Sequence, residues 1–318
     1  MIHPGSGSNQ NLYIFRLLPV ENWRKTFMKH GIYYAYWEDM WGADYLPYIE
    51  KVAKLGFDFL EIGCAPLNDF SMETLKELRK AADDNGSFLT AGYGPIAERN
   101  LGSADPAIVQ NGKNFWFEIF KRFEVLGIKT VGGGLNSYWP VDFSKPFDKA
   151  ADWARSVVNV RDVAKVAVDY GVDFCLEVLN RFEGYMLNTC AEACQFVDEV
   201  GLPNVRVMLD TFHMNIEEDD LAEAVRLAGK RLGHFHTGEC NRRVPGKGRT
   251  PWREIGQALR EIGYEGTVCM EPFVKMGGEV GRDIHIWHNM YEDLSIEKLD
   301  KDAADAVKFQ RYMFDGLM

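Results

Sequence analysis

The sequence of this protein predicts an α/β fold, a single (β/α)8 TIM barrel. Short runs rich in β-branched and aromatic residues alternate with longer amphipathic stretches of helical period. The 318 residues exceed the roughly 250 that such a barrel typically needs. Because each short run is followed by one amphipathic stretch, the pattern favours a parallel sheet that closes on itself.

The expected strands are short and spread along the whole chain. They comprise residues 31–35, 59–62, 88–92, 130–133, 173–178, 205–209, 232–236 and 267–271. The alternative fold, a doubly wound open sheet, commonly carries a glycine-rich phosphate loop after its first strand. Here the first strand runs into the bulky aromatic segment YYAYWEDMWG, which favours the barrel.

The expected helices lie between these strands and carry terminal signals. They comprise residues 43–55, 71–85, 106–126, 153–170, 191–200, 221–228 and 252–262, with a closing helix within 295–318. Ser71 stands where a helix should begin, as N-cap serines do. Glycines stand where helices should end, as C-cap glycines do: Gly56, Gly127, Gly171, Gly201 and Gly263.

The first 27 residues precede the barrel pattern. Their opening PGSGSNQ is typical of a disordered segment, and the stretch lacks the basic start and cleavage site of a signal peptide. We therefore expect residues 1–27 to be a flexible extension and residues 28–318 to be the catalytic barrel with its C-terminal helix.

Composition and charge narrow the possible functions. The net charge is −11, and an acidic protein without a broad basic patch is a poor nucleic-acid binder. No apolar run reaches the roughly 18 residues that a membrane span needs. The six cysteines contain no Cys-x-x-Cys pair, so we expect reduced thiols in a cytoplasmic protein.

Four potential metal ligands lie at the ends of four successive expected strands. Their spacings are 33, 26 and 35 residues, each about one strand–helix unit: Glu177, Asp210, His236 and Glu271. A lone strand-end carboxylate more often caps a helix or faces water, but strand ends of a barrel converge on one face. Three carboxylates with one imidazole suit Mn²⁺, Co²⁺ or Mg²⁺ with positions open for substrate.

The segments around these ligands carry longer motifs. They are LEVLNRFEGY, MLDTFHMNIEE, HFHTGECNRRVPGKG and MEPFV, with HGIYYAYW near the start and GGGLNSYWP in the middle. Together they resemble the D-tagatose 3-epimerase / D-allulose (D-psicose) 3-epimerase family, from about Met28 to the C-terminal helix. The resemblance implies a metal-dependent isomerase that epimerises free ketohexoses at C3, with Mn²⁺ or Co²⁺ favoured and Mg²⁺ also suitable.

The resemblance also implies roles for particular residues. Glu177 and Glu271 match the two catalytic carboxylates, which share the metal with Asp210 and His236. Residues that match substrate contacts are Tyr33, Trp139, Glu183, His213, Arg242 and Phe273. Some members have histidine at the position of Tyr93 and alanine at that of Gly134, and both positions bear on substrate preference. Members are commonly dimers or tetramers, so we expect a homodimer or homotetramer.

The chemistry is consistent with these roles. The C3 proton of a ketose is acidified by the C2 carbonyl, and a divalent ion can stabilise the resulting enediolate. Two carboxylates flanking C3 can remove a proton from one face and return it to the other. The expected pairs are D-fructose/D-allulose or D-tagatose/D-sorbose. A related aldose–ketose isomerase is the alternative, whereas a DNA-repair nuclease would need more than seven histidines and a basic groove.

A shortened protein that begins at Met28 should keep the activity and the melting temperature of the full chain, because the barrel pattern starts there. Thermal unfolding and turnover of the two proteins provide the measurement. A marked loss of either property would show that residues 1–27 pack on the barrel.

Overall fold

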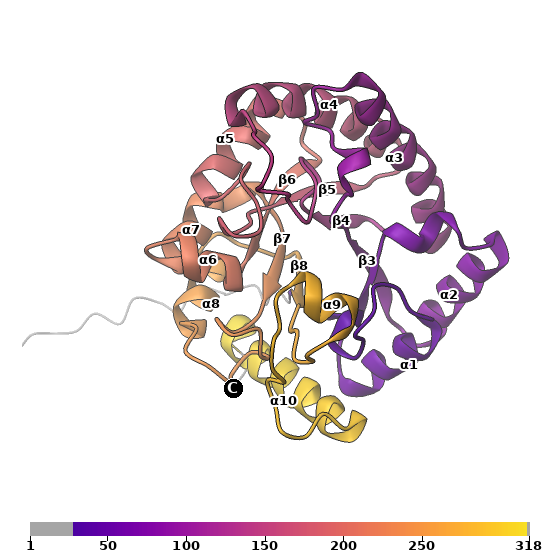
Figure 1. The fold of residues 1–318 in the computed structure, drawn as a ribbon. Coiled ribbons are helices and arrows are strands. Elements are labelled where there is room, and N and C mark those ends of the chain that lie inside the picture. The colour runs from indigo at the N-terminus through magenta and orange to yellow at the C-terminus, as the bar shows by residue number, and fades with distance from the viewer. Residues whose placement is uncertain (1–27, 317–318) are drawn as a thin grey trace, which may run out of the picture.

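The computed structural model describes residues 28–316, which form a closed (β/α)8 barrel (Figure 1). Within this range, eight parallel strands pair in chain order, and β8 pairs with β1. The helices surround the strands as an outer ring (Figure 1). The predicted fold class is therefore confirmed, whereas the predicted flexible extension, residues 1–27, lies outside the described residues.

The strands are close to those expected. They are β1 (Lys29–Tyr33), β2 (Phe59–Gly63), β3 (Phe88–Gly92), β4 (Thr130–Gly133), β5 (Asp173–Glu177), β6 (Val205–Asp210), β7 (Leu232–Thr237) and β8 (Thr267–Met270). The first strand begins two residues earlier than predicted. The last residues predicted for it, 34–35, belong instead to the short 3₁₀ helix Tyr34–Tyr36. Strand β8 ends just before Glu271, whose N–H nevertheless donates to the carbonyl of Thr237.

The helices include two that the sequence pattern did not predict. The α-helices of the described residues are α1 (Leu46–Leu55), α2 (Met72–Asp84), α3 (Pro106–Leu126), α4 (Lys149–Asp169), α5 (Cys190–Val200), α6 (Thr211–Glu217), α7 (Leu221–Ala228), α8 (Trp252–Glu261), α9 (Gly278–Asp283) and α10 (Ile296–Asp315). Helices α6 and α9 are too short to show a helical period. Helix α4 starts earlier than predicted because Asp148 caps it.

The predicted serine and glycine signals at helix ends are confirmed, and Gly171 and Gly263 follow the C-cap residues Tyr170 and Ile262. The Ser71 hydroxyl accepts a hydrogen bond from the N–H of Thr74. All five glycines expected at C-caps have positive φ angles, between 64° and 94°. These caps satisfy terminal backbone groups that would otherwise lack partners.

Large aromatic side chains join the helical ring to the barrel. Trp116 of α3 and Phe174 of β5 are fully buried and pack edge to face, with ring centroids 4.7 Å apart. Burying a side chain of this size contributes roughly 2–3 kcal/mol to folding. All six cysteines are unpaired, as expected. Among the described residues, no helix is long and apolar enough to cross a membrane.

Two consecutive glycines, the last residue of β4 and the first residue of the loop that follows, have different environments. Gly133 has a φ of +129°, and a Cβ there would lie 2.1 Å from the backbone oxygen of Tyr93. A Cβ at Gly134 would meet only the Leu179 side chain at an ordinary contact distance, 3.6 Å. Only the first position therefore requires glycine.

Gly133→Ala should lower the free energy of unfolding by about 2 kcal/mol or more, because it combines backbone strain with a steric clash. The matched substitution Gly134→Ala should change it by less than about 0.5 kcal/mol. Urea denaturation of both variants measures the difference. Equal stabilities would contradict the backbone conformation assigned to this loop.

Candidate active site

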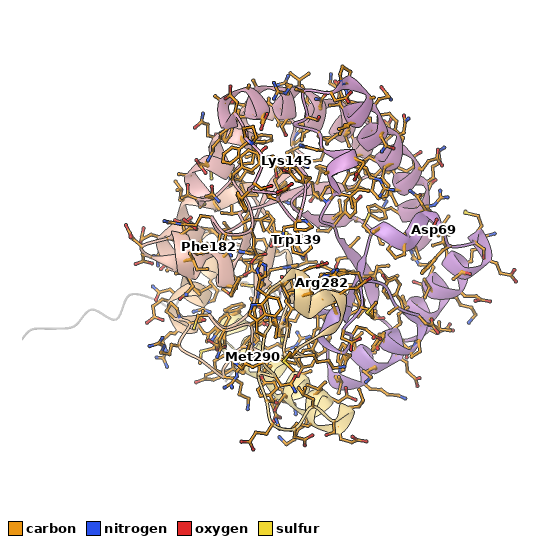
Figure 2. The ribbon with its side chains drawn as sticks, in the orientation of Figure 1. Asp69, Trp139, Lys145, Phe182, Arg282 and Met290 are labelled. Carbon is orange, nitrogen blue, oxygen red and sulfur yellow. The ribbon has the colours of Figure 1, made fainter. Side chains whose placement is uncertain are left out.

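A pocket of about 530 Å³ opens at the carboxyl ends of the strands. Nine of the ten site residues predicted from the sequence line it: Tyr33, Trp139, Glu177, Glu183, His213, His236, Arg242, Glu271 and Phe273. The tenth, Asp210, is fully buried next to Glu177, His236 and Glu271. With side chains drawn, Trp139 lies near the centre of this barrel face, and Asp69 and Phe182 lie farther out on opposite sides (Figure 2).

The four predicted metal ligands lie together. Each offers one ligand atom, and these atoms are within 4.8 Å of one another: Glu177, Asp210, His236 and Glu271. The Nδ1 atom of His236 is 3.8 Å from Asp210 Oδ2 and 3.6 Å from Glu271 Oε1.

Two atoms of this cluster lack hydrogen-bond partners although they are buried. They are Asp210 Oδ2 and His236 Nδ1. Buried polar atoms are nearly always satisfied, and an exception calls for an explanation such as an ion. A divalent cation among the four side chains would satisfy both atoms, so the residues fit the implied metal.

Asp210 also holds the helix that follows it. Its other oxygen, Oδ1, accepts hydrogen bonds from the N–H groups of Phe212 and His213 and so caps α6. The two oxygens of the Asp210 carboxylate therefore differ in role. Oδ1 accepts hydrogen bonds from the backbone of α6, and Oδ2 lies with the other residues of the cluster.

Glu61 of β2 supports the cluster from inside the barrel, and the sequence prediction missed it. Its Oε1 lies 2.7 Å from Nε2 of His236, and its Oε2 lies 2.9 Å from Nε2 of His234. Thr90 donates to the same Oε2 at 2.7 Å. Because Nε2 of His236 is engaged, its Nδ1 is turned toward the other ligands, as is common behind metal-binding histidines.

The same three side chains form a second group of potential ligands, Glu61, His234 and His236. Their carboxylate oxygens and Nε2 atoms already bond to one another, which favours a supporting role. A charged residue inside the apolar strand segment FLEIG was the signal that could have identified Glu61.

Burial and neighbouring charges shift the pKa values of two residues in the cluster, Glu177 and His236. Burial raises the pKa of Glu177 well above its usual value, and the charge of Glu271 raises it further. Burial alone would lower the pKa of His236, but the Glu61 and Glu271 carboxylates raise it well above its usual value. These shifts favour the protonated forms of both groups in the metal-free protein, and a bound cation would displace the protons.

His213 is held as a neutral hydrogen-bond donor. Burial lowers its pKa. Its Nδ1 accepts from the backbone N–H of Asn180 at 3.2 Å and lies 2.8 Å from the Asn180 side-chain nitrogen. The proton of the ring is therefore on Nε2, which lies 3.7 Å from Glu177 Oε1. Asn180 was not assigned a role from the sequence.

Arg242 lies between two carboxylates on the pocket wall. It donates from Nη1 to Glu271 Oε2 at 3.1 Å and from Nη2 to Glu183 Oε1 at 3.5 Å. Its guanidinium lies 3.7 Å from the centre of the Phe212 ring. This residue has a φ of +63°, so the conformation of its loop has to be imposed by the surroundings.

Buried Glu239 imposes that loop conformation. Its carboxylate accepts hydrogen bonds from the N–H groups of Gly246 and Thr250 and from the Trp252 indole, and its carbonyl accepts from the N–H of Arg242. The loop that carries Arg242 is thus fixed at several points.

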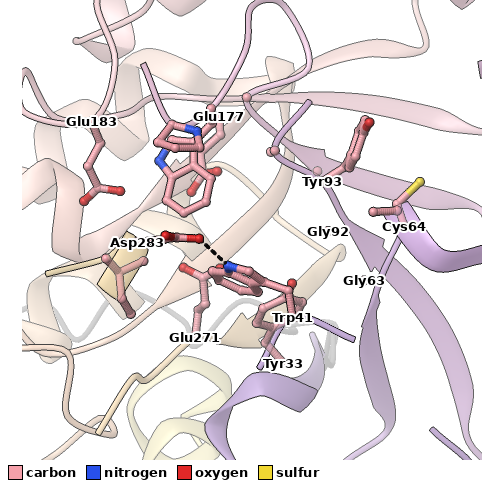
Figure 3. Close-up of a pocket in the computed structure, with 18 of the residues that line it drawn as sticks. Tyr33, Trp41, Gly63, Cys64, Gly92, Tyr93, Glu177, Glu183, Glu271 and Asp283 are labelled. Atoms are coloured by element: carbon pink, nitrogen blue, oxygen red, sulfur yellow. Dashed lines mark hydrogen bonds between the residues drawn. The ribbon is translucent and has the colours of Figure 1, made fainter. Parts of the chain in front are cut away.

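Aromatic residues from the first and last loops cover one side of the pocket. The Trp41 indole donates to Asp283 Oδ2 at 2.8 Å, which joins the loop after β1 to α9 (Figure 3). Trp41 also packs edge to face against Trp139 and Phe273, at 5.9 and 6.2 Å between ring centroids. Tyr33 packs edge to face against Phe273 at 6.2 Å.

The fold and this constellation define a class of proteins. A family model described as xylose isomerase-like TIM barrel matches residues 49–293. The D-psicose 3-epimerase of Ruminiclostridium cellulolyticum is 57% identical over 288 residues, covering 91% of this chain and 98% of that protein. The D-psicose 3-epimerase of Agrobacterium fabrum is 55% identical over 289 residues, covering 91% of this chain and 100% of that protein.

A solved structure of such an epimerase also has the same fold as this chain. The crystal structure of D-psicose 3-epimerase with D-tagatose from Clostridium cellulolyticum H10 superimposes with a TM-score of 0.89 at 57% identity, covering 90% of this chain and 99% of that one. The chain therefore belongs to the D-tagatose 3-epimerase / D-allulose (D-psicose) 3-epimerase family of these barrels. It is an isomerase with ketose 3-epimerase activity.

Metal binding should release protons, because Glu177 and His236 must lose theirs to become ligands. The affinity for Mn²⁺ should therefore fall as the pH is lowered from about 8 to about 6. Calorimetric titrations in buffers of different ionisation enthalpy should give buffer-dependent heats.

Asp210→Asn is the matched variant. Burial alone would raise the pKa of Asp210, but the surrounding charges, that of Arg242 among them, hold it below its usual value and favour the ionised carboxylate. The variant should bind metal more weakly yet still release protons. Identical heats in all buffers would contradict the protonated state assigned to Glu177 and His236.

Proposed function

We propose that this protein interconverts free ketohexoses at C3, either D-fructose with D-allulose or D-tagatose with D-sorbose. Glu177 and Glu271 act as the two proton carriers. The observation that carries the proposal is the clustering of two carboxylates, Glu177 and Glu271, with buried unsatisfied atoms of Asp210 and His236.

The two glutamates reach the pocket from different parts of the barrel. Glu177 ends β5, and Glu271 follows β8. A ketose bound between them presents one face of C3 to each carboxylate. Either carboxylate takes the proton from its face, and the other carboxyl returns a proton to the opposite face.

Unequal surroundings support the two roles. The carboxyl of Glu177 lies 3.7 Å from Nε2 of His213, whereas Glu271 is held by Arg242 at 3.1 Å. Arg242 orients the Glu271 carboxylate through this hydrogen bond, and both glutamates line the pocket. Glu183, His213 and Arg242 then bind and orient hydroxyl groups, since all three line the same pocket.

The metal residues are Glu177, Asp210, His236 and Glu271. A divalent ion, Mn²⁺ or Co²⁺ with Mg²⁺ as a further candidate, would supply Lewis-acid stabilisation of the negative charge that develops on the C2 carbonyl oxygen of the substrate. Glu61 holds the His236 ring in the orientation this requires.

The substrate is a free sugar in this proposal. Arg242 is bound by Glu183 and Glu271, so its charge is not available to a phosphate group. Tyr33, Trp139 and Phe273 present aromatic surfaces of the kind that bind neutral sugars. Assembly into a homodimer or homotetramer and a cytoplasmic location stay predictions.

Epimerisation in D₂O should place deuterium at C3 of the product, because the proton returned comes from a carboxyl that exchanges with solvent. Glu177→Gln and Glu271→Gln should each lower the rate of epimerisation by about 10²–10⁴-fold, the usual contribution of a general acid–base group. Chromatography of the products and NMR of C3 measure both effects.

The control is Glu254→Gln, which changes an exposed glutamate of α8. It should keep wild-type kinetics. Metal content is measured for all variants, since both site glutamates are also proposed ligands. A C3 epimer without deuterium would overturn the two-carboxylate mechanism, and an aldose product would favour the alternative, an aldose–ketose isomerase.

A further inference from the structure

Two cysteines lie close together in the helical ring, away from the active-site pocket. Cys190 is the first residue of α5, and Cys194 follows one helical turn later. Their sulfur atoms are 3.9 Å apart. Neither residue lines the pocket at the carboxyl ends of the strands. The pair is therefore a reactive group that the proposed function leaves unused.

The interface between α5 and α7 holds both thiols, and the two helices are neighbours in the ring (Figure 1). Cys190 is fully buried, and its Sγ donates to the carbonyl of Ala224 at 3.1 Å. Cys194 is 7% exposed, and its Sγ donates to the carbonyl of Leu227 at 3.8 Å. Both sulfurs thus lie on the same side of α5, and the exposed edge of Cys194 gives a small ligand a route to them.

The separation of the two sulfurs suits a bridging atom better than a disulfide. A disulfide needs sulfurs about 2.05 Å apart and Cβ atoms about 3.8 Å apart. Residues four apart on an α-helix have Cβ atoms about 5–6 Å apart, so a disulfide would distort the turn. Two metal–sulfur bonds of about 2.3 Å that meet at a tetrahedral angle span about 3.8 Å. One atom bound to both sulfurs therefore fits the helix as it stands.

The site offers two sulfurs and no further protein ligand of the usual kinds. Within residues 28–316, the groups of three or more potential metal ligands that lie together contain neither cysteine. A structural zinc ion normally takes four protein ligands, so the pair does not fit one. Thiolates select soft centres, and trivalent arsenic that carries one organic group needs only two sulfurs. We infer that Cys190 and Cys194 form a binding site for monosubstituted trivalent arsenicals, independent of the proposed function.

The binding reaction is a condensation without a change of redox state. The two thiol protons pass to the oxygen of the arsenical oxide, which leaves as water, and two As–S bonds replace the As–O double bond. The resulting ring closes over the first turn of α5. Because the sulfurs already have the required spacing in the folded protein, the ligand binds the native chain more tightly than the unfolded chain.

The probe is phenylarsine oxide, added to the full-length protein together with a monothiol that removes adducts on single cysteines. Mass spectrometry should find one phenylarsine group per chain. After trypsin digestion, the group should be on the fragment 182–206, which contains Cys190 and Cys194 and no other cysteine. The melting temperature should rise when the ligand is bound.

Serine variants test the need for both sulfurs. Cys190→Ser and Cys194→Ser should each weaken binding by about 10²–10⁴-fold, the usual gain from linking two binding groups. Cys240→Ser is the matched control, because Cys240 is less buried than the other cysteines. This control should leave the affinity unchanged.

The remaining outcomes would overturn the inference. They are phenylarsine on a different fragment, undiminished binding in both serine variants, and no binding to the wild-type protein. A lower melting temperature with ligand would show that the unfolded chain binds better, which contradicts a preformed site. Fragment analysis uses only the wild-type protein, so it decides the question even if a serine variant folds poorly.

Discussion

The pairing of β1 with β8 is the constraint on which the site depends. It closes the sheet, so that side chains far apart in the sequence are brought to one point. The four clustered ligands come from β5 to β8, whereas Tyr33 and Glu61 approach from β1 and β2. Glu61 and His236, 175 residues apart, can bond only because the strands surround a common interior.

That interior concentrates negative charge. The barrel buries four acidic side chains almost completely: Glu61, Glu177, Asp210 and Glu183. Charged groups in such surroundings must be paired or neutralised. Arg242 and His236 provide part of the compensation, and the raised pKa of Glu177 reflects its burial and the charge of Glu271.

The sequence predicted the barrel because its signals are local. Strand runs, helical periods and C-cap glycines depend on a few neighbouring residues, and the spacing of the four ligands follows from one residue at each strand end. The contribution of Glu61 could not be predicted in this way, because it arises from pairing across the barrel with His234 and His236.

Other features also depended on tertiary contacts. Helices α6 and α9 are too short for a repeating hydrophobic pattern to reveal them, and α6 begins at its N-cap Asp210. The pairing of Arg99 with Tyr93 depends on a platform supplied by Phe115 of α3, which follows in the chain. The roles proposed for the ten site residues remain predictions, although the fold brings those residues together.

The two tasks of the Asp210 carboxylate have a thermodynamic consequence. Because Oδ1 is anchored to the backbone of α6, the torsions of this side chain are fixed when the protein folds. A cation at the proposed site would meet a ligand with little rotational freedom left to lose, so association would be entropically favoured over binding to a flexible carboxylate. The first turn of a seven-residue helix would thereby preorganise the proposed ion site.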